Sequence, residues 1–261
     1  MRLMKTVISF LLLIIAMLIS GTKATAESPQ YYEIRSYLLG EQGDAEAIHE
    51  YLRDAFLPAM HRLDAGPIGV FHNSDEDKSG SPRIVVVIPH EKADSIHICK
   101  KKLTEDAEYQ KAAQAYLARE PKNSPYQRIE SELLVAMDCM PLLEVPKNQL
   151  KNPNRVFELR VYESANERLG ELKVDMFNNG EVPIFLDCGI KPICIGQAII
   201  GPFTPNLSYL TTYPSEKART EAWTAFRSHP DWQVLKKISK YAGTVSKIHK
   251  YVMKPAEYSQ I

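Results

Sequence analysis

The chain has 261 residues, and its 32 Lys and Arg residues are balanced by 32 Asp and Glu residues. Charges of both signs are interspersed and the formal net charge is zero, so we expect no nucleic acid as a partner. The length is sufficient for two domains of ordinary size, each with its own buried core. The densest basic run, residues 100–102, lies next to acidic residues and is typical of a solvated helix face.

Residues 1–26 have the pattern of a cleavable signal peptide. Arg2 and Lys5 precede an uncharged apolar run over residues 7–19, which is shorter than the ~20 residues that a membrane-spanning helix needs. Small residues follow, so we expect cleavage near Ala26 and Glu27. The pattern predicts export to the periplasm or out of the cell, with no stable membrane span after cleavage. An uncleaved N-terminal anchor is the alternative.

The rest of the sequence contains one long segment twice. Residues 32–37 (YEIRSY) return as residues 157–162 (FELRVY), and the same offset of 125 joins residues 89–93 (PHEKA) to residues 214–218 (PSEKA). Further on the offset becomes 123, which aligns residues 108–110 with residues 231–233. A repeat of this length indicates a duplicated domain, because solenoid units run about 20–50 residues.

For each copy the pattern predicts strand, helix, strand, strand, helix and strand in that order. In the first copy, the strands are expected at residues 31–39, 68–72, 82–88 and 128–137, and the helices from about residues 44 and 91. In the second copy, a hairpin is expected at residues 193–200 and 207–213, a helix from residue 216 and a closing strand at 244–253. We expect Asn178, Asn179 and Gly180 to break the first helix of this copy before Pro183.

Two such units make a pair of ferredoxin-like βαββαβ domains, an α+β fold. Each sheet would have helices on one face only, so the open faces can pack together and close an eight-stranded barrel with the helices outside. We place the first domain at residues 27–140, a proline-rich linker at residues 141–154 and the second domain at residues 155–261. The two domains are expected to pack on each other, and further oligomerisation stays open.

Alternation along the first strand of each copy separates two sets of side chains. The apolar set, including Tyr32 and Ile34, suits the helix-covered face, so the polar set is expected to point into the barrel. This candidate site consists of Glu33, Arg35, Tyr37, Glu158, Arg160 and Tyr162. One interpretation is a buried ion-pair network that holds the two halves together. The other is a polar cavity floor, in which Arg binds an anion and Tyr donates a proton.

Other signals for chemistry are weak. His61, near the end of the first helix, is a further, weak candidate, and an exposed or capped histidine is the favoured interpretation. The sequence has no metal-binding spacing of His or Cys and no nucleotide-binding or serine-hydrolase motif, so we expect no metal and no cofactor. The four cysteines allow three pairings, and Cys188 with Cys194 is one pair that could close a small loop.

The repeated motifs, together with His229-Pro230-Asp231-Trp232 and the turn Gly189-Ile190-Lys191-Pro192, resemble the NIPSNAP domain in two tandem copies. The resemblance covers nearly all of the chain after residue 26 and is better in the second copy. It implies the dimeric α/β-barrel superfamily, whose members include cofactor-free monooxygenases and haem-binding enzymes. It carries no catalytic residue over to this chain.

Three functions follow as hypotheses. The first is an exported NIPSNAP-like protein that binds a small apolar ligand or acts as an accessory protein. The second is a cofactor-independent, monooxygenase-like enzyme in which Arg35 and Tyr37, or Arg160 and Tyr162, position an aromatic or other small hydrophobic substrate. The third is a haem-dependent variant, with His61 as the ligand of the iron.

Overall fold

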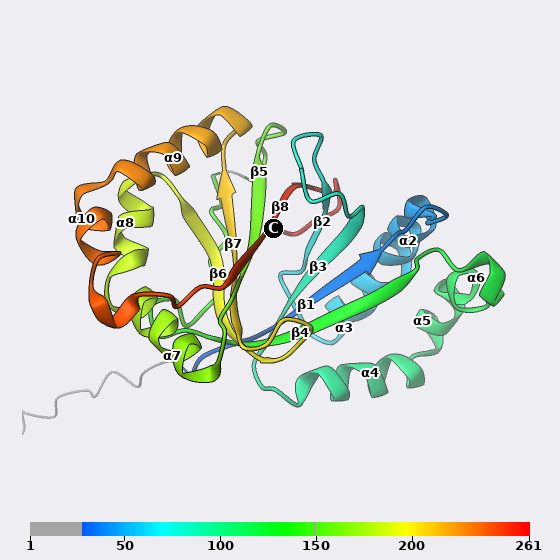
Figure 1. Ribbon diagram of the computed structural model, residues 1–261. Helices are drawn as coiled ribbons and strands as arrows, with labels where there is room; N and C mark the ends of the chain where they lie inside the picture. Colours follow the sequence, from blue (N-terminus) through cyan, green and yellow to red (C-terminus); the bar gives the residue numbers. More distant parts are fainter. Residues whose placement is uncertain (1–27, 149) are drawn as a thin grey trace, which may run out of the picture.

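The computed structural model describes residues 28–148 and 150–261. Eight strands form a closed barrel in the order β1-β3-β2-β8-β5-β7-β6-β4, and every neighbouring pair is antiparallel. Helices α2–α6 cover one side of the barrel and helices α7–α10 the opposite side (Figure 1). The fold is therefore a mixed α/β barrel. The expected signal peptide lies outside the described residues.

The strands alternate with helices along the chain in the expected order. The strands are β1 (Tyr31–Leu38), β2 (Gly69–Asn73), β3 (Arg83–His90), β4 (Arg128–Ala136), β5 (Val156–Glu163), β6 (Lys191–Ile200), β7 (Asn206–Tyr213) and β8 (Lys247–Pro255). The helices of the first half are α2 (Ala45–Tyr51), α3 (Leu57–Arg62), α4 (Ser95–Glu105), α5 (Ala107–Ala112) and α6 (Gln114–Leu117). Those of the second half are α7 (Glu167–Met176), α8 (Val182–Asp187), α9 (Glu216–Ser228) and α10 (Pro230–Leu235).

In the part of the chain that the structure describes, no helix combines the length and the apolar character that a membrane span requires.

A π-helical turn joins the first two helices of each half. It spans Leu52–Phe56 in the first half and Phe177–Glu181 in the second, and each is followed by a helix with proline in its first turn. Proline is tolerated there because the N–H groups in the first turn of a helix have no partner within the helix, so proline, which has no N–H, costs no hydrogen bond. The expected break at Asn178, Asn179 and Gly180 is confirmed, because the backbone leaves helical geometry at Gly180 (φ 179°, ψ −32°) and a kink separates α7 from α8 within this turn.

The interior of the barrel is a continuous apolar core shared by both halves. Tyr32 and Ile34 of β1 lie there together with Phe157 and Leu159 of β5. A barrel of eight strands has an interior just wide enough to be filled by side chains, and most of those that fill it are apolar. The Tyr32 hydroxyl is buried among them without a hydrogen bond to a described residue. The separation of β1 and β5 into two faces is thus confirmed, but the assignment of the apolar face to the helices is wrong.

The polar set lies on the outside of the barrel, beneath the helices. Tyr37 belongs to the core formed with α2 and α3, and Tyr162 belongs to the equivalent core of the second half. Side chains alternate between the two faces of a strand, so the other polar residues of the set share this outer face: Glu33, Arg35, Glu158 and Arg160. The prediction that they point into the barrel is therefore wrong.

A different carboxylate enters the barrel. Glu132 of β4 accepts hydrogen bonds from the Asn206 side chain at 2.7 Å and from the Ser208 hydroxyl at 2.9 Å. Burial raises the pKa of Glu132, and these two hydrogen bonds oppose that shift.

All four cysteines are free in the structure. Cys194 points into the apolar barrel interior, whereas Cys188 packs against the helix layer of the second half. These two side chains lie on opposite faces of the sheet, which explains why the pair is not joined.

The shared core predicts that the two halves unfold together. The rings of Phe71 and Phe157 lie 4.7 Å apart across the interior, and both residues are buried. We expect Phe71→Ala to lower the free energy of unfolding by about 3–5 kcal/mol. Both tryptophans lie in the second half, so urea unfolding monitored by tryptophan fluorescence should shift as much as unfolding monitored by circular dichroism.

The exposed residue Ile238 supplies the control, and Ile238→Ala should change either transition little. An unshifted fluorescence transition in Phe71→Ala would show that the halves unfold independently.

Candidate functional site

The helix layer of the first half encloses a cavity of about 840 Å³. It lies between strands β1, β3 and β4 on one side and the helices around α4 on the other. This volume is within the range of about 300–1,000 Å³ that small-molecule sites occupy. The cavity brings together three of the residues expected from sequence, Glu33, Arg35 and Tyr37.

The floor of the cavity is a buried ion pair with a histidine beside it. Arg35 Nε donates to Glu33 Oε1 at 2.8 Å, and His90 Nε2 lies 3.7 Å from Glu33 Oε2. Burial by itself would raise the pKa of Glu33, but His90 and the Arg35 charge outweigh it and lower this pKa to about 2. Glu33 is therefore a carboxylate at neutral pH.

His90 is a buried polar side chain whose contact with Glu33 is longer than a hydrogen bond. Its Nε2 atom is buried and has no hydrogen bond to any described residue. Buried polar atoms are nearly always paired, so this nitrogen requires an explanation. The His90 side chain lines the cavity next to Glu33.

Five tyrosines form the wall: Tyr37, Tyr51, Tyr109, Tyr116 and Tyr126. The Tyr51 and Tyr116 rings stack with centroids 3.9 Å apart, and the Tyr51 and Tyr109 hydroxyls lie 2.9 Å apart. Burial raises the pKa of Tyr37, Tyr51 and Tyr116 above the usual value. The wall is therefore a neutral aromatic surface that carries hydroxyl groups.

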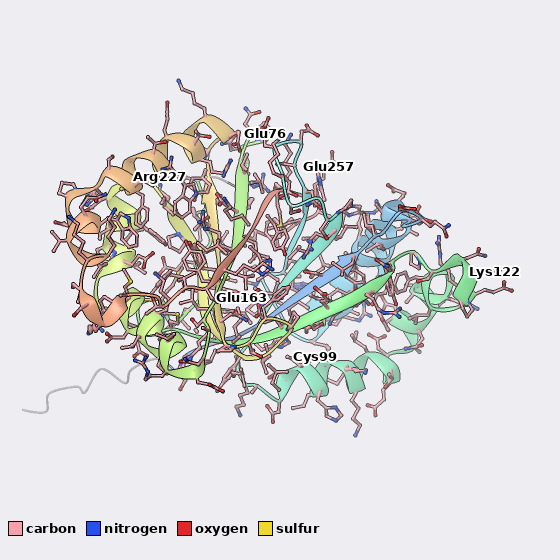
Figure 2. All side chains as sticks on the ribbon, viewed as in Figure 1. Glu76, Cys99, Lys122, Glu163, Arg227 and Glu257 are labelled. Atoms are coloured by element: carbon pink, nitrogen blue, oxygen red, sulfur yellow. The ribbon has the colours of Figure 1, made fainter. Side chains whose placement is uncertain are left out.

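Helix α4 and the end of the sheet form the mouth. The mouth includes Leu117, Ile129 and Ile200, which are large apolar side chains exposed to solvent. Cys99, labelled on α4 in Figure 2, also lines the cavity, and burial raises the pKa of its thiol. An apolar rim around a partly polar floor is typical of a site for a small, mostly apolar molecule.

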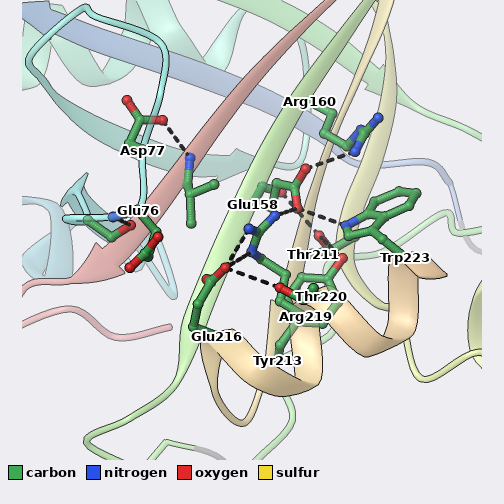
Figure 3. Close-up of polar contacts among 12 residues, drawn as sticks. Glu76, Asp77, Glu158, Arg160, Thr211, Tyr213, Glu216, Arg219, Thr220 and Trp223 are labelled. Atoms are coloured by element: carbon green, nitrogen blue, oxygen red, sulfur yellow. Dashed lines mark hydrogen bonds and ion pairs between the residues drawn. The ribbon is translucent and has the colours of Figure 1, made fainter.

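In the second half, side chains fill the space between α9 and the sheet, which is the counterpart of the cavity. Arg160 donates to Glu158 Oε1 at 2.8 Å, and both Arg219 and the Trp223 indole N–H donate to Glu158 Oε2 at 2.8 Å (Figure 3). The Arg160 guanidinium lies 4.0 Å from the centroid of the Trp223 ring. Glu158 is thus fully paired within the protein.

A second buried ion pair completes the filling of this half. Lys173 Nζ lies 2.6 Å from Glu181 Oε2, and both side chains are buried. Nearby, the Tyr209 hydroxyl donates to the Tyr162 hydroxyl at 2.7 Å. The predicted residues Glu158, Arg160 and Tyr162 therefore belong to a buried network whose partners all lie in the second half, so this network does not join the two halves as the ion-pair interpretation expected.

The two halves differ in where the helix after the third strand begins. Ser215 caps α9 by accepting a hydrogen bond from the Ala218 N–H at 3.2 Å. His90 occupies the aligned position in the first half, and β3 continues to it. Helix α4 then begins at Ser95 rather than near residue 91, so the expected start is wrong for this copy. Only Leu103 of α4 is buried, whereas α9 buries Ala222, Trp223 and Phe226.

His61 is exposed in the last turn of α3 and does not line this cavity. Among residues 28–148 and 150–261, no group of three or more His, Cys, Asp and Glu side chains is placed to hold a metal ion. Sequence reasoning missed His90 and the tyrosine wall. One signal was available in the repeat: His90 stands where the second copy has Ser215, a residue type that caps helices.

Comparison with solved structures shows the fold. A candidate monooxygenase from Fusobacterium nucleatum has a TM-score of 0.56 and 8% identity over 87% of this chain and 93% of its own. Another candidate monooxygenase, from Lactobacillus acidophilus, has a TM-score of 0.51 and 10% identity over 87% of this chain and 94% of its own. An uncharacterized NIPSNAP-like domain protein from Burkholderia xenovorans matches 41% of this chain and 90% of its own at 16% identity and a TM-score of 0.38.

No curated protein matches the sequence significantly. The NIPSNAP family model matches residues 157–260, which contain strands β5–β8 and the filled helix layer. The second half of the chain is therefore a NIPSNAP domain.

Proposed function

We propose that the chain is a NIPSNAP-like binding protein that holds a small, mostly apolar ligand in the cavity beneath α4. The observation that carries this proposal is the cavity of about 840 Å³, with its tyrosine wall and apolar mouth. Glu33 and Arg35 neutralise each other on the floor, so the site offers directional polar contacts without a net charge. This favours a neutral ligand or a weakly polar one.

The proposal also assigns different roles to the two related halves of the chain. The strand order β4-β1-β3-β2 of the first half is repeated as β8-β5-β7-β6 in the second. We interpret the barrel as two ferredoxin-like domains fused in one chain, an intrachain counterpart of a dimeric α/β barrel. In this interpretation the first domain retains a binding site and the second has converted its site into a structural network.

Filling the cavity tests the binding function. Cys99→Trp places a large ring on the side of α4 that lines the cavity, and we expect it to weaken naphthalene binding at least about tenfold by occupying the volume. Lys102→Trp on the same helix is the control, because Lys102 is exposed and does not line the cavity. Isothermal titration calorimetry gives both dissociation constants. Absence of naphthalene binding to the unaltered protein, or equal binding by both variants, would refute the proposal.

A second candidate is a cofactor-independent monooxygenase. Two solved structures described as candidate monooxygenases share the fold over most of this chain, and the cavity presents His90 and Tyr37 to a bound molecule. In such a reaction the substrate itself supplies the electrons. For 1-naphthol, one oxygen atom of dioxygen would enter the ring to give the naphthoquinone, and the other would leave as water.

Tyr37 and Tyr162 provide a matched pair for this candidate. If Tyr37 donates a proton to the substrate, Tyr37→Phe should lower dioxygen uptake with 1-naphthol about 100-fold, while Tyr162→Phe in the filled half should not. An oxygen electrode and quinone absorbance measure the rate. Uptake no faster than in buffer, or equal rates in the two variants, would contradict the enzymatic candidate.

We propose further that the protein is exported, on the basis of the basic start, the apolar run and the small residues before Glu27. Protein recovered from its own cells should then begin near Glu27, which N-terminal sequencing measures. A chain that retains residues 1–26 would contradict cleavage.

A further inference from the structure

The second half of the chain holds an aromatic ring at the place where the first half has its cavity. The Trp223 ring lies against Arg160 and donates its N–H to Glu158 Oε2 (Figure 3). Glu33 and Arg35 are the repeat counterparts of Glu158 and Arg160, and they form the same ion pair at the same distance of 2.8 Å. The two carboxylates therefore start from the same local arrangement.

The helices can be aligned by their shared landmarks. Helix α5 begins at Ala107 and helix α10 at Pro230, while Leu103 and Phe226 are buried on α4 and α9. The two helix starts are 123 positions apart, and so are the two buried residues. This is the offset that aligns residues 108–110 with residues 231–233 in the sequence. By this alignment Trp223 corresponds to Lys100, and Arg219 corresponds to Ile96.

Glu33 consequently lacks two of the donors that Glu158 has. Glu158 Oε2 accepts from Arg219 and from Trp223, but Ile96 has no donor and Lys100 is exposed at the cavity mouth. Arg35 and, at 3.4 Å, the Ser131 hydroxyl donate to Glu33 Oε1, whereas Glu33 Oε2 makes a long ion pair with His90 Nε2 at 3.7 Å. A carboxylate oxygen that lines a cavity and has only a long contact of this kind keeps the capacity to accept a further, shorter hydrogen bond.

We infer that the ligand is a planar aromatic molecule with a ring N–H or O–H, bound against Arg35 with its donor on Glu33 Oε2. This inference rests on the proposed binding function and names the class of ligand for the same cavity. The Trp223 side chain of the second half shows the arrangement within the same molecule.

Three probe molecules of similar size separate the contribution of shape to the binding affinity from the contribution of hydrogen bonding. Indole has the N–H donor, 1-methylindole has the same rings without it, and naphthalene has neither a donor nor a heteroatom. We expect indole to bind about tenfold or more tightly than 1-methylindole, because a hydrogen bond to a buried charged acceptor is worth more than one between neutral groups. Isothermal titration calorimetry with the full chain measures all three affinities.

Glu33→Gln tests the acceptor directly. The preference for indole over 1-methylindole should fall several-fold, since the acceptor loses its charge. Naphthalene affinity should stay about the same, and this binding shows that the cavity is still formed in the variant. Retention of the full preference for indole would overturn the role of Glu33.

Lys100→Trp places an indole at the position of Trp223. The side chain should fill the cavity and weaken all three probes at least about tenfold, whereas Lys101→Trp, on an exposed position of α4, should not. Equal binding of indole and 1-methylindole to the unaltered protein would overturn the inference and leave the binding function intact. Binding of none of the three probes would overturn both.

Discussion

The difference between the two halves depends on the start of the helix that follows the third strand. In the second half, Ser215 caps α9 at once, and the helix lies on the sheet with Trp223 against Arg160. In the first half, His90 prolongs β3, so α4 begins later and buries one residue instead of three. A change in a single capping position thus accompanies the presence of a cavity in one half and its absence from the same place in the other.

The two halves also differ in how their equivalent carboxylates, Glu158 and Glu33, are paired. A buried carboxylate is tolerated only with charged or hydrogen-bonding partners, and Glu158 obtains all of them from Arg160, Arg219 and Trp223. Glu33 keeps the arginine partner, and its second oxygen has a long contact of 3.7 Å with His90 Nε2 beside the cavity. The repeated Glu-Arg-Tyr motif therefore has different surroundings in the two halves: it is paired within the protein in the second half and lines the cavity in the first.

Much of the fold was predictable from the repeat, because alternation and turn residues place the strands independently of tertiary contacts. The faces of β1 and β5 were separated correctly but assigned to the wrong sides. An apolar row such as Tyr32 and Ile34 fits a helix layer as well as a barrel interior, and only closure of the barrel decides between them. The cavity was not predictable, since it depends on how far α4 lies from the sheet. The tyrosine wall likewise comes from helices that meet only in the folded chain.

The central claim is that a ligand-sized space exists beneath α4 while α9 leaves none at the equivalent place. Xenon occupies apolar cavities in protein crystals and reports them without any assumption about the natural ligand. A crystal of the protein under xenon pressure should show xenon near Tyr51, Met60 and Leu103, and none between α9 and the ion pair of Glu158 with Arg160. Helix α4 packed against the sheet, with no xenon beneath it, would contradict the account.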